Sequence, residues 1–150
     1  MERKPKLFAE IDIGDELGPV VRVPTTEVVK RYAQAARLYH GLPFFFDPEH
    51  ARRSGFERPV VPGPLNATFL AQMLKDHFVG WQLRALNTSF RAPVAHGDTL
   101  TLWGTVTEKT WQDGVATVHC DVVIENDRGD RVVVGTAVLS RREPKGRLWR

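Results

Sequence analysis

The sequence predicts a single α+β domain in which an antiparallel sheet wraps one long apolar helix. Helical patterns occupy the N-terminal half of the chain, and four strand-like segments rich in β-branched residues follow them. No linker, repeat or low-complexity segment separates the two halves, and 150 residues is the length of one ordinary domain. We therefore expect one domain over residues 1–150, with basic tails at 1–6 and 143–150.

The central helix is predicted from residue 63 to about residue 78. Its apolar side chains recur three and four residues apart, which is the pattern of a buried helix: Leu65, Phe69, Leu70, Met73 and Leu74. Pro64 suits the first helical turn, because the missing N–H would have had no partner there. Gly63 leaves room for a ligand to approach the backbone. We therefore expect free N–H groups at this helix start to face a ligand site.

Shorter elements precede the central helix. A strand is expected around residues 20–23, and a helix starts at the Thr25–Thr26 pair, where a hydroxyl can cap the first turn. We expect that helix to run to about Leu38 and to be ended by His40-Gly41-Leu42-Pro43, since glycine caps helices and proline stops them. Asp47 followed by Pro48 is a cap and first-turn pair, so a short second helix is predicted there.

Four strands are predicted in the second half of the chain. Their segments alternate apolar and polar residues and cover residues 81–93, 99–111, 115–126 and 131–142. Asp113-Gly114 is a hairpin signal between the second and third segments. The segments therefore predict an antiparallel meander.

Composition and charge exclude several classes of protein. The net charge is +3, but residues 1–6 contribute +2 and residues 141–150 contribute +4, which leaves the body at −3 and argues against a nucleic-acid partner. The basic ends are either solvated tails or, through Arg141 and its neighbours, contacts for phosphates. No apolar run is long enough for a membrane span, so we expect a cytoplasmic protein without a membrane partner.

Neither a disulfide nor a metal site is expected. Cys120 is the single cysteine, and it lies in a strand-like run where a small filler residue, in the core or on the surface, is the simplest interpretation. The histidines that follow His40 have no spacing typical of metal ligands.

An ordered set of short motifs carries a resemblance to a known family over nearly the whole chain. The motifs are Tyr32-Ala33-Gln34-Ala35-Ala36, Asp47-Pro48-Glu49-His50-Ala51, Gly55-Phe56, Pro59-Val60-Val61-Pro62-Gly63-Pro64-Leu65, Leu86-Asn87-Thr88-Ser89-Phe90-Arg91-Ala92-Pro93-Val94 and Gly97-Asp98-Thr99-Leu100. The chain resembles the MaoC-like hydratases and dehydratases of the hot-dog fold, of the R-specific enoyl-thioester hydratase type. The resemblance therefore implies a hot-dog domain.

The resemblance also implies an activity. Members of this family reversibly add water to 2-enoyl thioesters in fatty acid metabolism, and coenzyme A or a carrier protein carries the substrate without a further cofactor. An Asp and a His activate the water, and N–H groups at the start of the central helix stabilise the enolate oxygen. The family also implies a dimer with sites between its protomers, formed with a second copy or with another hot-dog subunit.

The family's catalytic pair is replaced in this chain. Alignment on the neighbouring motifs puts His40 where the Asp belongs, Leu42 where an Asn belongs and Phe45 where the His belongs. Pro62 stands where the family often has a His before the helix glycine. A phenyl ring cannot exchange a proton, so the standard pair is absent.

His40 and Asp47 are the remaining catalytic candidates. His40 is either a lone general base or acid near neutral pH, or a residue at the end of a helix that binds free carbonyls. Asp47 either steers His40 or only caps the short helix.

Four further residues are candidates for substrate binding. Phe45 is part of the core or of the acyl-pocket wall, and Asn66 either faces the thioester or bonds a neighbouring loop. Pro62 and Gly63 form the start of the central helix, where the resemblance places the N–H donor for the thioester oxygen.

Three functions remain open from the sequence. The first is a hydratase or dehydratase with an altered site that uses His40. The second is a non-catalytic subunit whose acyl-binding site serves a catalytic partner. The third is hydrolysis of an acyl-CoA thioester at the same helix start.

Overall fold

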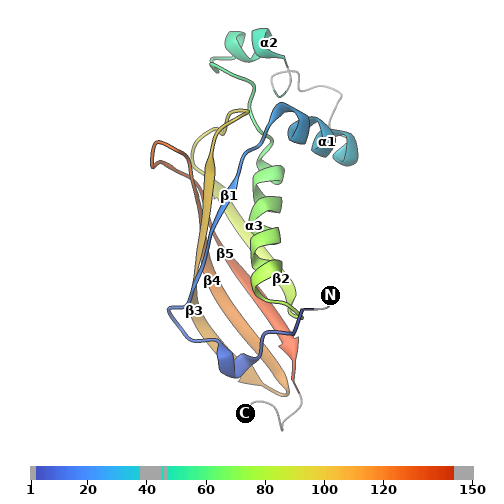
Figure 1. The fold of residues 1–150 in the computed structure, drawn as a ribbon, viewed down its shortest axis with the longest axis vertical. Coiled ribbons are helices and arrows are strands. Elements are labelled where there is room, and N and C mark those ends of the chain that lie inside the picture. Colours follow the sequence, from blue (N-terminus) through green and yellow to red (C-terminus); the bar gives the residue numbers. More distant parts are fainter. Residues whose placement is uncertain (1–2, 38–44, 46, 144–150) are drawn as a thin grey trace.

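A computed structural model describes residues 3–37, 45 and 47–143 of the chain (Figure 1). Five strands form one antiparallel sheet in the order β1-β3-β4-β5-β2, and helix α3 runs along one face of it. The predicted α+β architecture is therefore confirmed. In chain order the elements are η1 (Phe8–Glu10), β1 (Glu16–Arg22), α1 (Thr26–Ala36), α2 (Pro48–Arg53), α3 (Gly63–His77), β2 (Gln82–Phe90), β3 (Leu100–Gln112), β4 (Val115–Glu125) and β5 (Arg131–Arg142).

The four strands of the second half lie where the alternation predicted them. β3, β4 and β5 form the expected meander, and its first hairpin turns at Asp113 and Gly114, both with positive φ. β2 pairs with the far edge of β5, so sequence neighbours β2 and β3 are separated in the sheet. β1 is longer than predicted, because it pairs with β3 from Glu16 to Arg22 across a register shift.

The core lies between α3 and the facing side of the sheet. All five apolar residues that predicted the central helix are at most 7% exposed. Alternate residues of β3 and β4 meet them, among them Leu102, Val118 and Ile124. Cys120 is buried in the same layer, so of its two expected positions, core and surface, the structure shows the core. Burial of this continuous apolar layer is the main source of stability for the fold.

Helix α1 starts as predicted but ends early. The Thr25 hydroxyl accepts a hydrogen bond from the Val28 N–H at 3.2 Å. The helix stops at Ala36, because Arg37 adopts a left-handed conformation with φ of 56° and closes the last turn. The helix thus ends two residues before the limit expected near Leu38, and the expected stop at His40-Gly41-Leu42-Pro43 lies outside the described residues.

The ends of the described chain are built into the fold rather than extended as tails. The Lys6 N–H donates to the Val79 carbonyl at 2.8 Å, and Arg141 donates to the Lys6 carbonyl at 2.9 Å. Glu143 is 2% exposed and accepts a hydrogen bond from the Phe8 N–H at 3.0 Å. Lys6 and Glu143 thus differ from the predicted tails, and the Arg141 side chain is held by a hydrogen bond within the chain.

Among the described residues, no helix is both long enough and apolar enough to span a membrane.

Candidate functional site

The segment before α3 is held by the loop between β2 and β3. The Val61 N–H donates to the Val94 carbonyl at 2.7 Å, and the His96 N–H donates to the Pro59 carbonyl at 3.0 Å. An isolated β-bridge joins Val60 to Ala95 between these two bonds. This short pairing fixes where α3 begins and brings the loop beside its first turn.

The first turn of α3 leaves one N–H donor free. Pro62 occupies the capping position and offers no side-chain cap, while Pro64 has no N–H. The Leu65 N–H donates back to the Pro62 carbonyl at 3.0 Å. The Gly63 N–H is thus the donor at this end for which the described chain supplies no partner.

A cavity of about 360 Å³ lies at this helix start. Its walls are mostly apolar and contain three phenyl rings; they comprise Phe45, Phe56, Val60, Val61, Gly63, Asn66, Phe90, Arg91, Ala92, Pro93 and Val94. Within the described residues, none of these lining side chains carries a carboxyl or an imidazole. The walls can therefore hold an acyl chain but supply no group that exchanges protons near neutral pH.

Asn66 is the buried polar residue of this cavity. Its side chain is 3% exposed, and its Oδ1 atom has no hydrogen-bond partner in the described structure. A buried acceptor left unpaired costs about 1–3 kcal/mol. The prediction that Asn66 bonds a neighbouring loop is therefore not met for Oδ1, and an unpaired buried group of this kind calls for an explanation such as a water molecule, an ion or a ligand.

The space beside Gly63 is filled by Phe90. A Cβ atom at residue 63 would lie 2.9 Å from the Phe90 Cζ atom, closer than real contacts allow. The sequence led us to expect a ligand against this glycine, whereas the structure places a phenyl ring there. A side chain at residue 63 could therefore be accommodated only if the Phe90 ring moved.

The structure brings together only part of the predicted site. Phe45, Gly63 and Asn66 line the cavity, and Pro62 directly precedes it. Asp47 does not line it; the Asp47 carboxylate caps α2, with Oδ1 accepting from the Glu49 N–H at 3.0 Å. The capping prediction for Asp47 is confirmed. His40 lies outside the described residues.

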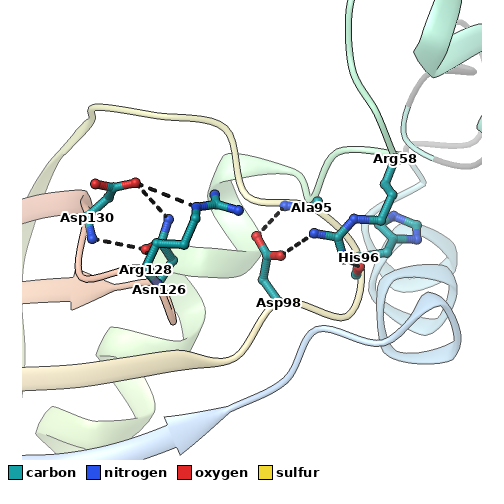
Figure 2. A network of polar contacts seen from close by, with 7 residues as sticks. All are labelled: Arg58, Ala95, His96, Asp98, Asn126, Arg128 and Asp130. Carbon is teal, nitrogen blue, oxygen red and sulfur yellow. Dashed lines mark hydrogen bonds and ion pairs between the residues drawn. The ribbon is translucent and has the colours of Figure 1, made fainter.

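The sequence analysis missed a polar network between Arg58 and the β2–β3 loop (Figure 2). His96 is 7% exposed, and its Nδ1 atom lies 3.0 Å from the Thr26 hydroxyl. Arg58 donates to the His96 carbonyl at 2.8 Å and to Asp98 Oδ1 at 2.7 Å, and the Ala95 N–H donates to Asp98 Oδ2 at 2.9 Å. The network therefore ties α1 and the segment before α3 to the β2–β3 loop.

The environment of His96 favours its neutral form. Burial lowers the pKa of His96 below its ordinary value, and the positive charges of Arg58 and Lys30 lower this pKa further. The nearby backbone carbonyls of Phe45 and Val60 oppose the shift, although Nε2 makes no hydrogen bond of good geometry with any described residue. His96 could not have been identified from its spacing to other residues in the sequence. What distinguishes it is its burial, which arises only in the folded chain.

Metal chemistry has no evident site in the described part of the chain, where no three side chains of His, Cys, Asp or Glu gather at a metal-binding distance.

Comparisons with known proteins agree with this geometry. The sequence profile of the FAS1-like, dehydratase domain region matches residues 12–134. The mitochondrial 3-hydroxyacyl-[acyl-carrier-protein] dehydratase of Arabidopsis thaliana is 35% identical over 88 residues, which are 59% of this chain and 51% of that protein. The chain thus spans about half the length of the curated relative that it matches.

Two solved structures share the fold. The (R)-hydratase from A. caviae involved in PHA biosynthesis has a TM-score of 0.77 at 26% identity, covering 89% of this chain and 98% of that one. The C-terminally truncated HadBC complex, a (3R)-hydroxyacyl-ACP dehydratase from Mycobacterium tuberculosis, has a TM-score of 0.73 at 24% identity, covering 87% and 98%. The predicted hot-dog fold is therefore confirmed.

Proposed function

The chain belongs to the FAS1-like dehydratase family of MaoC-like hot-dog proteins, and from that premise we propose that it acts on 2-enoyl and 3-hydroxyacyl thioesters. The thioester group lies at the start of α3, and the acyl chain lies along the apolar walls of the cavity. The carrier is coenzyme A or an acyl-carrier protein.

The unpaired oxygen of Asn66 is the observation that carries this proposal. An acceptor that is 3% exposed and unpartnered lies beside a cavity whose other walls are mainly apolar. A bound ligand that donates a hydrogen bond, such as a 3-hydroxyl or a pantetheine amide, satisfies it. If the Asn66 amide rotates by half a turn, the same site presents N–H donors to the thioester oxygen.

The proposed reaction is reversible hydration. A base takes a proton from water, the water oxygen bonds to C3, and C2 receives a proton, so one water molecule adds across the C2=C3 bond. The negative charge that develops on the thioester oxygen is stabilised by the Gly63 N–H at the start of α3. The proton-transfer group is then His40 or a residue of a second subunit.

A non-catalytic subunit is the second candidate function. Phe45 lines the cavity in the position where the family has its His, and the other described wall residues offer no acid or base. Such a chain would bind part of the acyl group while a partner with the intact Asp and His carries out catalysis. The HadBC complex supports this candidate as a hot-dog relative made of two different subunits.

A dimer is part of the proposal in either case. β1 and β2 are the edges of the sheet, and unpaired strand edges favour association with a further chain. A second copy gives a homodimer, and a different hot-dog subunit gives a heterodimer.

The test measures hydration of a 2-enoyl-CoA series by the isolated protein and then with a candidate partner subunit. Activity of the isolated protein that is lost in His40→Ala, but kept in the control His119→Ala, identifies an autonomous hydratase. Activity only with the partner identifies the non-catalytic subunit. A thiol assay on acyl-CoA detects hydrolysis. The proposal would be refuted if, under all of these conditions, the protein neither hydrated an enoyl thioester nor bound a thioester.

A further inference from the structure

Phe90 lies at the inner edge of the proposed site. It is the last residue of β2, and its Cζ atom is the nearest atom to the position a side chain at Gly63 would take. Leu86, four residues earlier on the same strand, packs against the core, so these two side chains project from the same face of the sheet. Phe90 thus points toward α3 from the end of the strand.

The Phe90 side chain is nevertheless only half buried. The residue is 52% exposed, although it points toward the helix side of the sheet. β2 is an edge strand, and Arg91 and Ala92, which follow Phe90, are exposed as well. Its phenyl ring therefore has Gly63 of α3 on one side and solvent on the other, and a half-exposed ring can change its rotamer more readily than a buried one.

The ring lies beside the residue that would bind the thioester oxygen. The Gly63 N–H is the free donor of the helix start, and the Phe90 ring lies against the same residue. A thioester oxygen that accepts from this N–H brings its C1 and C2 atoms next to the ring. Substrate binding then requires the ring to turn away from Gly63 or to be pushed aside.

We propose that Phe90 is a specificity-determining residue that closes the thioester site over Gly63 and limits the bulk of the acyl group beside it. This inference rests on the proposed thioester function. In the closed position the ring shields the free N–H from water. In the open position the ring becomes one wall of the acyl channel, so its size sets which chains fit.

The first experiment compares thioester binding across a series of acyl-CoAs from four to twelve carbons, straight and branched. Calorimetry is carried out on the wild-type protein, Phe90→Ala and Phe90→Trp, and on Val21→Ala, an equally exposed apolar residue on β1. In Phe90→Ala we expect affinity for long or branched chains to rise about tenfold relative to the four-carbon chain. In Phe90→Trp we expect the opposite change, and in Val21→Ala no change.

A second experiment locates the ligand at Phe90 directly. The natural thiol, Cys120, is buried, and burial raises its pKa to about 12, so a maleimide labels it slowly. Phe90→Cys introduces an exposed thiol at the site, and Val21→Cys introduces one away from it. We expect saturating acyl-CoA to slow labelling of the first variant about tenfold and to leave the second unchanged.

The outcomes separate this inference from the proposed function. If the wild-type protein binds thioesters but the chain-length profile is the same in both Phe90 variants, Phe90 does not determine specificity and only this inference fails. If bound thioester does not slow the labelling of Phe90→Cys, the same conclusion follows. If no thioester binds to the folded wild-type protein, alone or with its partner, the proposed function fails and this inference fails with it.

Discussion

The two ends of helix α3 are built in opposite ways. At its C-terminal end, Phe78 and Trp81 are buried with their rings 6.1 Å apart in an edge-to-face arrangement. The Trp81 Nε1–H donates to the Lys6 carbonyl at 2.7 Å, so the N-terminal segment closes over this end. At its N-terminal end, the Gly63 N–H and the Asn66 oxygen have no partner in the described chain, and a cavity adjoins them.

This difference separates stability from function along one helix. The closed end buries apolar surface and pairs its polar atoms, which stabilises the fold. The open end keeps unpaired polar atoms, which costs stability and prepares a binding site. Removing a buried group at the closed end should therefore lower the free energy of unfolding. Removing an unpaired polar atom at the open end should raise it and weaken ligand binding.

Trp81→Ala should have the largest effect, at the closed end. Removing a buried indole leaves a cavity and takes one of two hydrogen-bond donors from the Lys6 carbonyl, so we expect the free energy of unfolding to fall by about 3–5 kcal/mol. Urea denaturation followed by circular dichroism measures the change. Trp103→Ala is the matched control, because Trp103 is 36% exposed and should cost less than about 1 kcal/mol. Equal losses in the two variants would contradict the closed-end assignment.

Asp98→Ala should have the next largest effect, behind the open end. Asp98 is buried and accepts hydrogen bonds from Arg58 and the Ala95 N–H, so its removal leaves both donors unpaired. Arg58 is about half exposed, which reduces the loss to about 2 kcal/mol. The free energy of unfolding of this variant should be compared with that of Asp130→Ala. The Asp130 side chain is 64% exposed, so its removal should change stability little. A negligible effect for Asp98→Ala would show that the network does not hold the loop.

Asn66→Leu should change the free energy of unfolding in the opposite direction. Leucine has nearly the same shape and carries no unpaired oxygen, so we expect the free energy of unfolding to rise by about 1 kcal/mol. Thioester affinity, measured by calorimetry, should fall about tenfold in the same variant. Asn87→Leu, at an exposed position of β2, is the control for both measurements. A loss of stability in Asn66→Leu would mean that the amide is already satisfied.

The smallest expected effect is the dependence of stability on pH through His96. The unfolded chain binds a proton at His96 near the ordinary pKa of 6.5, whereas burial holds the pKa of His96 in the folded protein below that value. The unfolded state therefore binds more protons as the pH falls through 6.5, and stability decreases until the pH drops below the folded pKa. Burial, with a contribution from Lys6, also lowers the pKa of His77, so His77 acts in the same direction.

NMR titration of the His96 ring separates the two histidines. We expect its midpoint below 6.5 in the folded protein, and the pH dependence of unfolding should weaken in His96→Gln. A midpoint at or above 6.5 would contradict the buried, neutral state of His96.

Local patterns determined much of the fold from the sequence alone. Leu65, Phe69 and Met73 repeat with the period of a helix, and the four later segments alternate with the period of a strand, so each element could be placed from its own residues. The sequence also predicted that Gly63 and Asn66 belong to the helix start. It placed the end of α1 too late, because the left-handed turn at Arg37 has no glycine to signal it.

Tertiary structure alone decided which distant residues meet. His96 contacts Thr26 across 70 positions, and Arg58 contacts Asp98 across 40. The Phe90 ring reaches Gly63 because β2 pairs with β5 at the edge of the sheet, a neighbour that local periodicity does not encode. Periodicity reports which face of an element is buried, whereas the contents of a site depend on strand order and loop pairing, and these form only when the whole sheet closes around α3.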